Sequence, residues 1–394
     1  MNAFDLRRRR RTLLPAVAAL TASLLATPAA AQDRGTLAAR LQARLDSLVA
    51  PAAVPGMTLG VSLPDGSTLA LSAGVADTAR GQPMPADGLM LQGSVGKTYF
   101  GAVALQLVAE GRLDLDATVS RYLGHEPWFD RIPNGRTATV RDLLGHTSGI
   151  VRYEFNPAFL EDLTARPMRT FTPEERLSYL FDTEPPFAAG QGWEYSDTNY
   201  ILVAMLIEEV TGETAYAEIR RRILDPHVFS HTVPSDRPEI PGLVQAYAGP
   251  GNPFGGFDAM VDGGRLVINP QFEWGGGGFA SSASDLARWI HAVQEGRAFD
   301  PALLEVYRTG RPAPLGPEAS YGLGVIMMTL PTAGTAWGHS GFMPGYRTEA
   351  YYFPGGGFAV ALQVNTSTQG ALETSPLRML DGLAAIVQEE LGSG

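Results

Sequence analysis

Residues 91–100 read Leu91-Gln92-Gly93-Ser94-Val95-Gly96-Lys97-Thr98-Tyr99-Phe100. Ser94 and Lys97 form an S-x-x-K pattern, and a helix is predicted to begin near Ser94 and to end at Gly111. Because residues three apart share one helix face, the Lys97 amine is expected within reach of the Ser94 hydroxyl. Partial positive charge at the helix N-terminus favours a neutral amine and a developing oxyanion. The stretch therefore places the Lys97 amine beside the Ser94 hydroxyl at the start of a helix, an arrangement that suits proton exchange between them. A surface lysine after a capping serine is the alternative.

Lysine usage supports the same interpretation. Lys97 is the one lysine among 30 lysine and arginine residues. Arginine keeps its proton in proteins, whereas lysine loses it when its pKa is lowered. We infer that Lys97 stands where an amine is needed and that arginine serves wherever a positive charge suffices.

Composition narrows the possible functions. The chain has 394 residues, of which 45% are hydrophobic and 18% are charged, so a sizeable core is expected. Its net charge of −11 disfavours nucleic acid as a partner. The lack of cysteine excludes disulfides, thiol nucleophiles and thiolate metal sites. The six histidines are scattered, so we expect no metal and no cofactor.

The first 31 residues resemble a secretory signal. Arg7–Arg11 form a basic region, Leu13–Ala26 form a short apolar core, and Ala29–Ala31 offer small residues for cleavage near Ala31. An amphipathic helix of a cytosolic protein is the alternative. No later apolar run reaches the roughly 20 residues of a membrane span. We therefore expect a protein exported to the periplasm or secreted, without an integral membrane segment after signal removal; its oligomeric state stays open.

The order of predicted elements indicates an α/β (α+β) fold. An amphipathic helix at 36–50 precedes strands at 57–63 and 68–74, a long helical middle follows, and the chain closes with strands and a helix at 371–391. The closing strands are expected at 322–329, 346–353 and 357–364. We predict an antiparallel sheet flanked by helices, from 32–92 and 275–394, and an inserted helical lobe at 93–274. Ligands are expected between the lobes.

Two further motifs carry polar side chains at wide spacing. Tyr195-Ser196-Asp197 offers a phenol, and a phenol beside a lysine can relay a proton because both have free pKa values near 10. A turn that caps the following helix is the alternative interpretation. His339-Ser340-Gly341 lies on a predicted strand whose small residues let a substrate backbone approach. A buried histidine in a glycine-rich bend is the alternative there.

Other enzyme classes fit less well. Gly96-Lys97-Thr98 resembles the end of a P-loop, but Leu91 stands where that motif requires glycine. Neither Ser94 nor Ser340 lies in the G-x-S-x-G pattern of α/β-hydrolases, and the chain has no H-E-x-x-H zinc motif.

The three motifs together, in this order, resemble the serine β-lactamase/DD-peptidase superfamily, whose S-x-x-K element is a known catalytic motif. Stretches 143–149, 277–286 and 344–346 add to the likeness, which covers roughly 40–370. The resemblance implies a β-lactamase/transpeptidase-like fold and Ser94 as the nucleophile. It implies that Lys97 and Tyr195 share the base and acid roles, in an order left open. The backbone N–H groups of Ser94 and Phe342 would form the oxyanion hole.

Asp197 departs from that family, which usually has asparagine at this place. Its carboxylate would either pair with Lys97 and keep the amine charged or select a substrate with a cationic amine. Asp197, His339, Ser340, Gly341 and Arg347 are our candidate substrate-binding residues.

The resemblance implies an exported serine hydrolase that forms an acyl-enzyme with a small-molecule or peptide substrate. Peptides or amides of D-amino acids are the expected substrates, as in a D-alanyl-D-alanine carboxypeptidase. His339 and Arg347 are the nearby candidates for binding a terminal carboxylate, which leaves carboxypeptidase action open. A carboxylesterase of the same fold, a weak β-lactamase and a non-catalytic binding member of the family are the alternatives. Penicillin binding is expected of the peptidase-like enzyme.

Overall fold

The structure is a computed structural model that describes residues 28–49, 54–249, 252, 254–255, 257–316, 318–368, 370 and 372–392. Helix α1 (Pro28–Val49) begins before Ala31 and includes most of the helix predicted at 36–50. Residues 1–27, with the basic and apolar parts of the predicted signal, lie outside the described residues. The export signal therefore stays a prediction.

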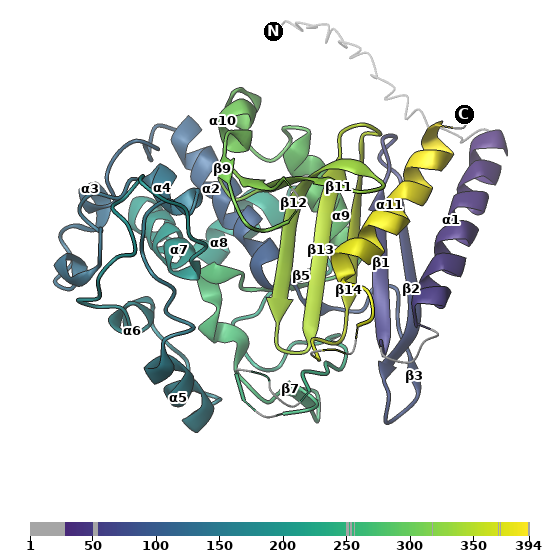
Figure 1. The fold of residues 1–394 in the computed structure, drawn as a ribbon, viewed down its shortest axis with the longest axis horizontal. Helices are drawn as coiled ribbons and strands as arrows, with labels where there is room; N and C mark the ends of the chain where they lie inside the picture. Colours follow the sequence, from purple (N-terminus) through teal and green to yellow (C-terminus); the bar gives the residue numbers. More distant parts are fainter. Residues whose placement is uncertain are drawn as a thin grey trace, which may run out of the picture.

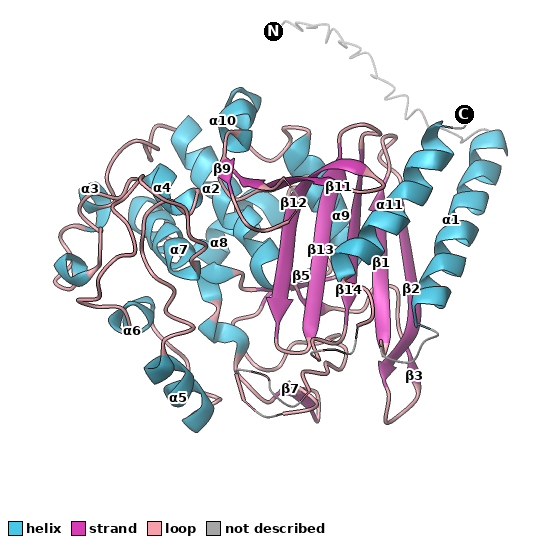
Figure 2. Cartoon of the chain, in the orientation of Figure 1, coloured by secondary structure: helices cyan, strands magenta, loops and turns pink. Residues whose placement is uncertain are grey.

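A nine-stranded antiparallel sheet forms the centre of the molecule (Figure 2). Its strand order is β3-β2-β1-β14-β13-β12-β11-β10-β9, so the two ends of the chain meet at β1 and β14. Every residue of these two strands is buried, as expected for strands covered on both faces. The strands are β1 (Gly56–Ser62), β2 (Thr68–Asp77), β3 (Gln82–Pro83), β9 (Arg311–Pro312), β10 (Ser320–Tyr321), β11 (Ile326–Leu330), β12 (Gly334–Met343), β13 (Tyr346–Phe353) and β14 (Phe358–Val364).

Helices cover both faces of this sheet (Figure 1). Helices α1 and α11 (Pro376–Gly392) lie side by side on one face, where Leu41, Leu45 and Leu380 join the core formed with the sheet. Helix α9 (Ala283–Gln294) packs on the other face, and Ser282 caps its N-terminus by accepting the Asp285 N–H at 3.3 Å. The sheet is thus the middle layer of three.

Short helices form the part of the molecule beside the sheet (Figure 1). Two of them pack as a buried pair, α2 (Lys97–Ala109) and α7 (Asp197–Thr211). The others are α3 (Ser120–Leu123), α4 (Val140–Leu144), α5 (Pro157–Ala165), α6 (Pro173–Ser178), α8 (Ala215–Ile219) and α10 (Leu304–Arg308). No helix in the described part of the chain is long and apolar enough to cross a membrane.

The predicted fold class is confirmed, and the differences are local. A 3-10 turn, η1 (Gly93–Gly96), precedes α2, so the α-helix begins at Lys97 rather than at Ser94. The strand expected at 322–329 begins only at Ile326, as β11, because a turn with Gly322 and Gly324 separates it from the short strand β10. The closing helix begins at Pro376 rather than at 371.

Sequence reasoning also missed a small sheet. It consists of β4 (Met90–Leu91), β8 (Phe279–Ser281) and β5 (Thr232–Pro234), in that order. Runs of two or three residues are too short for a hydrophobic period to emerge. The predicted division at 92/93 and 274/275 remains a prediction.

Candidate active site

Ser94 lies in the 3-10 turn η1, which ends directly before Lys97. Three segments of the chain come close together at this turn. A Cβ on Gly96 would overlap the Gly277 carbonyl, and a Cβ on Gly341 would overlap the Gln92 carbonyl. Only glycine permits both contacts, so these two positions fix the distance between the turn with Ser94 and its neighbours.

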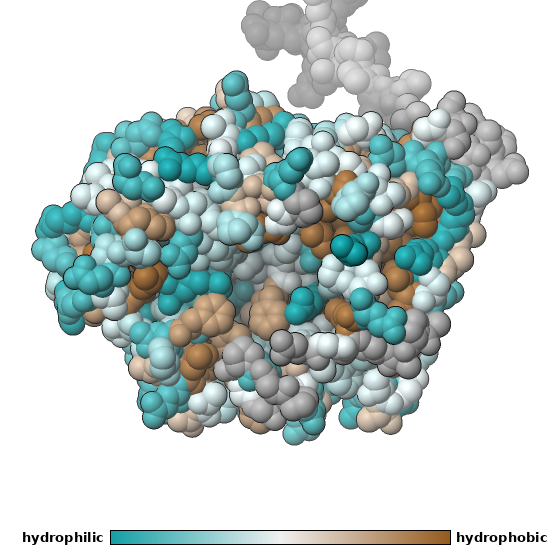
Figure 3. Space-filling view, viewed as in Figure 1, coloured by the Kyte–Doolittle hydropathy of each residue, from teal (hydrophilic) through white to brown (hydrophobic). Residues whose placement is uncertain are grey.

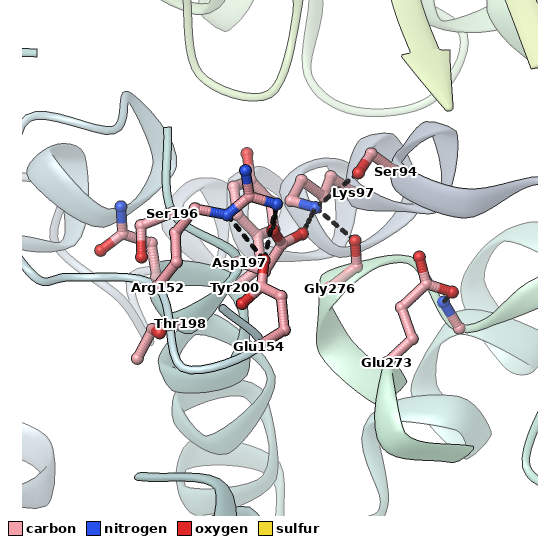
Figure 4. Close-up of polar contacts among 12 residues, drawn as sticks. Ser94, Lys97, Arg152, Glu154, Ser196, Asp197, Thr198, Tyr200, Glu273 and Gly276 are labelled. Carbon is pink, nitrogen blue, oxygen red and sulfur yellow. Dashed lines mark hydrogen bonds and ion pairs between the residues drawn. The ribbon is translucent and has the colours of Figure 1, made fainter. Parts of the chain in front are cut away.

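The Lys97 ammonium group is fully buried and uses all of its donors. Its Nζ donates to the Ser94 Oγ at 3.0 Å, to Asp197 Oδ1 and to the Gly276 carbonyl (Figure 4). An ammonium group has three N–H donors, and these three acceptors engage them all. Burial is the largest single influence and lowers the pKa of Lys97, but the charges and hydrogen bonds of Asp197 and Tyr195 together outweigh it, so the pKa is raised and the resting amine is charged.

Asp197, the first residue of α7, is paired on both oxygens. Oδ1 accepts from Lys97, and Oδ2 accepts from Arg152 Nη2 at 2.6 Å. Arg152 Nε also donates to Glu154 Oε1 at 2.7 Å. Burial raises the pKa of Asp197, but the Lys97 and Arg152 charges dominate and lower it. Of the two roles considered for this aspartate, the structure shows the pairing with Lys97.

Tyr195 lies beside the Lys97 amine. Nζ is 4.9 Å from the Tyr195 ring centroid, and the hydroxyl is buried without a hydrogen-bond partner among the described residues. Burial raises the pKa of Tyr195 more than the Lys97 charge lowers it, so the resting phenol is neutral. The S-x-x-K motif and the second motif are therefore brought together as expected.

His339 is buried on β12 and is a neutral imidazole. Its Nδ1 lies 2.6 Å from the Ser340 carbonyl, and its Nε2 lies 3.0 Å from the Tyr321 hydroxyl. Burial, followed by the Lys97 charge, lowers the pKa of His339 to about 3. The side chain therefore offers no positive charge for a substrate carboxylate at neutral pH.

The rest of the third motif does not supply a cation to the site either. Ser340 Oγ donates to Glu349 Oε2 at 2.5 Å and contacts the Tyr351 hydroxyl at 2.8 Å. Burial raises the pKa of Glu349 to about 7. Arg347 lies over the Phe342 ring, 5.9 Å from its centroid, and is not among the residues that line the cleft.

A cleft opens at Ser94, and its empty space, counted with the part open to solvent, is about 470 Å³. Figure 3 shows hydrophobic surface on both sides of a hollow near the middle of this face. Phe342 is 41% exposed there, and its backbone nitrogen would lie 2.6 Å from a Cβ on Gly93, next to Ser94. The expected oxyanion donors are thus neighbours. The lining residues are Ser94, Arg152, Tyr153, Glu154, Phe155, Asp197, Phe254, Phe272, Glu273, Phe342, Met343 and Pro344.

Glu273 is a second buried acid of the cleft, and sequence reasoning did not find it. Its side chain follows η4 (Pro270–Phe272), and the residue is 7% exposed. Oε2 accepts the Gly278 N–H at 3.0 Å, and burial raises the pKa of Glu273 to about 8. Arg152, Glu154 and Gly276 were missed as well.

One signal in the sequence pointed to part of this set. A buried carboxylate where the family has an amide requires compensating positive charge, so Asp197 indicated a second cation near the site besides Lys97. Nothing comparable marks Glu273, which lies in a segment without regular periodicity. Within the described residues, no group of three or more His, Cys, Asp or Glu could hold a metal ion.

The chain as a whole is similar to a known family and to several known proteins. The family model described as Beta-lactamase matches residues 41–382. Esterase EstB of Burkholderia gladioli is 27% identical, over 93% of this chain and 100% of its own length. A D-stereospecific amidohydrolase from Streptomyces sp. superposes with a TM-score of 0.74 and 28% identity, covering 90% of this chain and 99% of its own.

A second solved structure is equally similar. The D-amino acid amidase of Ochrobactrum anthropi SV3, complexed with D-phenylalanine, has a TM-score of 0.76 and 25% identity, with coverage of 91% of this chain and 99% of its own. These relatives are serine hydrolases of the β-lactamase/transpeptidase superfamily. Since the family model spans most of the chain, this protein belongs to the beta-lactamase family.

Proposed function

We propose that this protein is an exported serine hydrolase that cleaves amides or short peptides of D-amino acids through an acyl-enzyme on Ser94. The observation that carries the proposal is the hydrogen bond of 3.0 Å between Lys97 Nζ and Ser94 Oγ, at the mouth of an aromatic cleft. Two similar structures, from Streptomyces sp. and Ochrobactrum anthropi, are D-specific amide hydrolases and support this substrate class.

Acylation requires a neutral base beside Ser94. Lys97 is charged at rest and Tyr195 is neutral, so one proton must leave this pair before the reaction. Ser94 Oγ then attacks the substrate carbonyl carbon, and its proton passes to the Lys97–Tyr195 pair. The N–H groups of Ser94 and Phe342 stabilise the oxyanion, each donor contributing about 3 kcal/mol. The pair returns the proton to the leaving amine, and water hydrolyses the ester.

The charges of the cleft favour an amide over a substrate that ends in a carboxylate. Lys97 and Arg152 are both engaged by Asp197, and His339 is neutral. Arg347 lies outside the lining of the cleft. A terminal carboxylate would therefore have to compete with Asp197 and Glu154 for Arg152, the cation in the cleft lining, and desolvation without a partner of its own is costly. The cleft therefore suits hydrolysis of amides better than hydrolysis of peptides that end in a free carboxylate, as in a D-alanyl-D-alanine carboxypeptidase.

The test measures ammonia release from D-phenylalanine amide and from its L enantiomer, with Ser94→Ala as the control. We expect release from the D form, at least about tenfold slower release from the L form, and none from the variant. Release that persists in Ser94→Ala would remove the proposed nucleophile. Equal rates for both enantiomers would contradict the proposed selectivity for D-amino acids.

An esterase is the second candidate, and two observations favour it. EstB aligns with nearly the whole chain, and the cleft is lined by the aromatic rings of Phe155, Phe254, Phe272 and Phe342. Turnover of p-nitrophenyl butyrate with no release from D-phenylalanine amide would select this function. Benzylpenicillin in the same assay tests β-lactamase action, which we expect to be weak.

A further inference from the structure

We propose that Glu273 binds the ammonium group of the substrate and so selects acyl donors with a free amine close to the scissile carbonyl. This inference rests on the proposed function, because it concerns the same cleft. It assigns to Glu273 the selectivity that the sequence analysis considered for Asp197.

Glu273 has a free acceptor at the cleft. Its Oε2 accepts the Gly278 N–H, whereas its Oε1 has no hydrogen bond among the described residues and is not sealed from solvent. The residue is nevertheless 7% exposed, so water satisfies this oxygen poorly. A buried carboxylate with an unused oxygen gains much from a charged donor.

The other acids of the cleft are already occupied. Asp197 is paired on both oxygens, and Glu154 is bound by Arg152 at 2.6 Å. The second oxygen of Glu154 is closed off from solvent. In Figure 4, Glu273 lies apart from this cluster, and no dashed line joins it to the labelled cations. Of the carboxylates that line the cleft, Glu273 alone presents an unpaired oxygen to a ligand.

The charges around Glu273 also suit a cation better than an anion. Asp197 engages both Lys97 and Arg152, so neither cation is left to pair with an ionised Glu273. Burial raises the pKa of Glu154 well above its usual range, so Glu154 adds no negative charge of its own at neutral pH. An ammonium group would give the Glu273 carboxylate its missing partner, whereas a substrate carboxylate would meet it with like charge.

The groups that set the ionisation of Glu273 are identifiable. Lys97 lowers its pKa and Asp197 raises it, and the phenols of Tyr153 and Tyr216 lie close enough to respond to its charge. Burial is the largest influence and places the pKa at about 8. A free α-amine has a pKa of about 7.7–8.0. The fractions of carboxylate and of ammonium are therefore jointly largest near pH 8.

The experiment compares two ligands that differ in the amine. D-phenylalanine amide and 3-phenylpropionamide are titrated by calorimetry into Ser94→Ala, which prevents turnover, and into the same variant with Glu273→Gln. We expect the amine-bearing ligand to bind at least about tenfold tighter in Ser94→Ala. Glu273→Gln should erase that preference and leave the affinity for 3-phenylpropionamide unchanged. The ratio of the two affinities should be largest near pH 8, where the Glu273 carboxylate and the ligand ammonium coexist.

Glu208→Gln provides a matched control. Glu208 on α7 also accepts one backbone N–H, from Ala215 at 3.0 Å, and its pKa is likewise raised by burial. It does not line the cleft, so its variant should keep the preference for the amine.

Three results would overturn the inference: no preference in Ser94→Ala, a preference that survives Glu273→Gln, or an equal loss of affinity for both ligands. The proposed function is tested separately by reaction of the wild-type protein with a serine-directed phosphonate. If Ser94 is not labelled while the amine preference holds, the hydrolase proposal fails and the amine site stands. If Ser94 is labelled while the preference is missing, only the amine site fails.

Discussion

Asp197 and Glu273 are two buried carboxyl groups on the same cleft, and their surroundings give them opposite properties. Asp197 lies between two cations, Lys97 and Arg152, which hold its pKa low. Glu273 has one backbone donor and a pKa of about 8. Burial disfavours the charge of both groups, so the difference comes from partners. One acid is committed to Lys97, and the other has an oxygen free for a ligand.

Replacing Lys97 breaks the Asp197 side of this comparison and should have the largest effect. Lys97→Met removes the proposed proton partner of Ser94, and we expect kcat/KM to fall by about 10³. Lys97→Arg keeps the charge next to Asp197, but arginine cannot release a proton at neutral pH. The kcat/KM of this variant should therefore fall nearly as far. Initial rates with p-nitrophenyl butyrate measure both.

If Lys97→Arg kept a tenth or more of the activity, a fixed positive charge would be sufficient at this position. The proton-transfer role of Lys97 would then be wrong. Circular dichroism of both variants separates this result from misfolding.

Substitutions at Asp197 and Arg152 should shift the pH dependence in opposite directions. The Asp197 charge raises the pKa of Lys97, so Asp197→Asn should make the neutral amine available at lower pH. Arg152 offsets the Asp197 charge, so Arg152→Met should make the neutral amine available only at higher pH. The activity of the wild type on a neutral ester should rise toward alkaline pH, and each variant should move this rise by about one pH unit.

The measurement is kcat/KM between pH 6 and 10, with Asp197→Asn/Arg152→Met as the reference. The double variant should lie between the single ones, because it removes both charges. Shifts in the same direction for both single variants would contradict the arrangement in which Arg152 compensates Asp197.

The two acids should also affect stability with opposite sign. The pKa of Glu273 is raised from about 4.3 in an unfolded chain to about 8. Between these values the folded protein retains a proton that the unfolded chain loses, so Glu273 lowers stability as pH rises. Glu273→Gln should therefore be more stable than the wild type at pH 8, by roughly 1–3 kcal/mol, and the gain should disappear near pH 4.

Asp197→Asn is the counterpart in the same denaturation experiment. The pKa of Asp197 is lowered, so its stabilisation is present above the unfolded value of about 3.9 and is lost as pH falls toward its folded pKa. The variant should be less stable than the wild type at pH 7. The comparison fails if both variants change stability in the same direction at pH 8.

Much of the fold and part of the site could be predicted from the sequence. Strands such as 346–353 and the spacing of Ser94 and Lys97 follow from local patterns, and the fold class follows from the order of elements. The pairing of β1 with β14 joins residues about 300 positions apart and was reached only as a general expectation for the two chain ends.

The rest of the site depends on loops that no periodicity describes. Arg152 lies in an irregular segment after α4, and Glu273 lies between two 3-10 turns. The direction of neither side chain could therefore be predicted from the sequence. The substrate-binding role of Arg347 stays a prediction. Its number placed it near the third motif, but strand pairing with Phe342 puts its guanidinium over a ring rather than in the cleft lining.

The most direct test of the account is whether Ser94 carries the acyl group. The wild type and Ser94→Ala are mixed with p-nitrophenyl butyrate and quenched in acid after milliseconds to seconds. The mass of the intact protein is then measured by mass spectrometry. The account predicts a transient mass increase of one butyryl group in the wild type, mapped to Ser94, and none in the variant. Release of p-nitrophenol without that adduct, or an adduct that persists in Ser94→Ala, would contradict it.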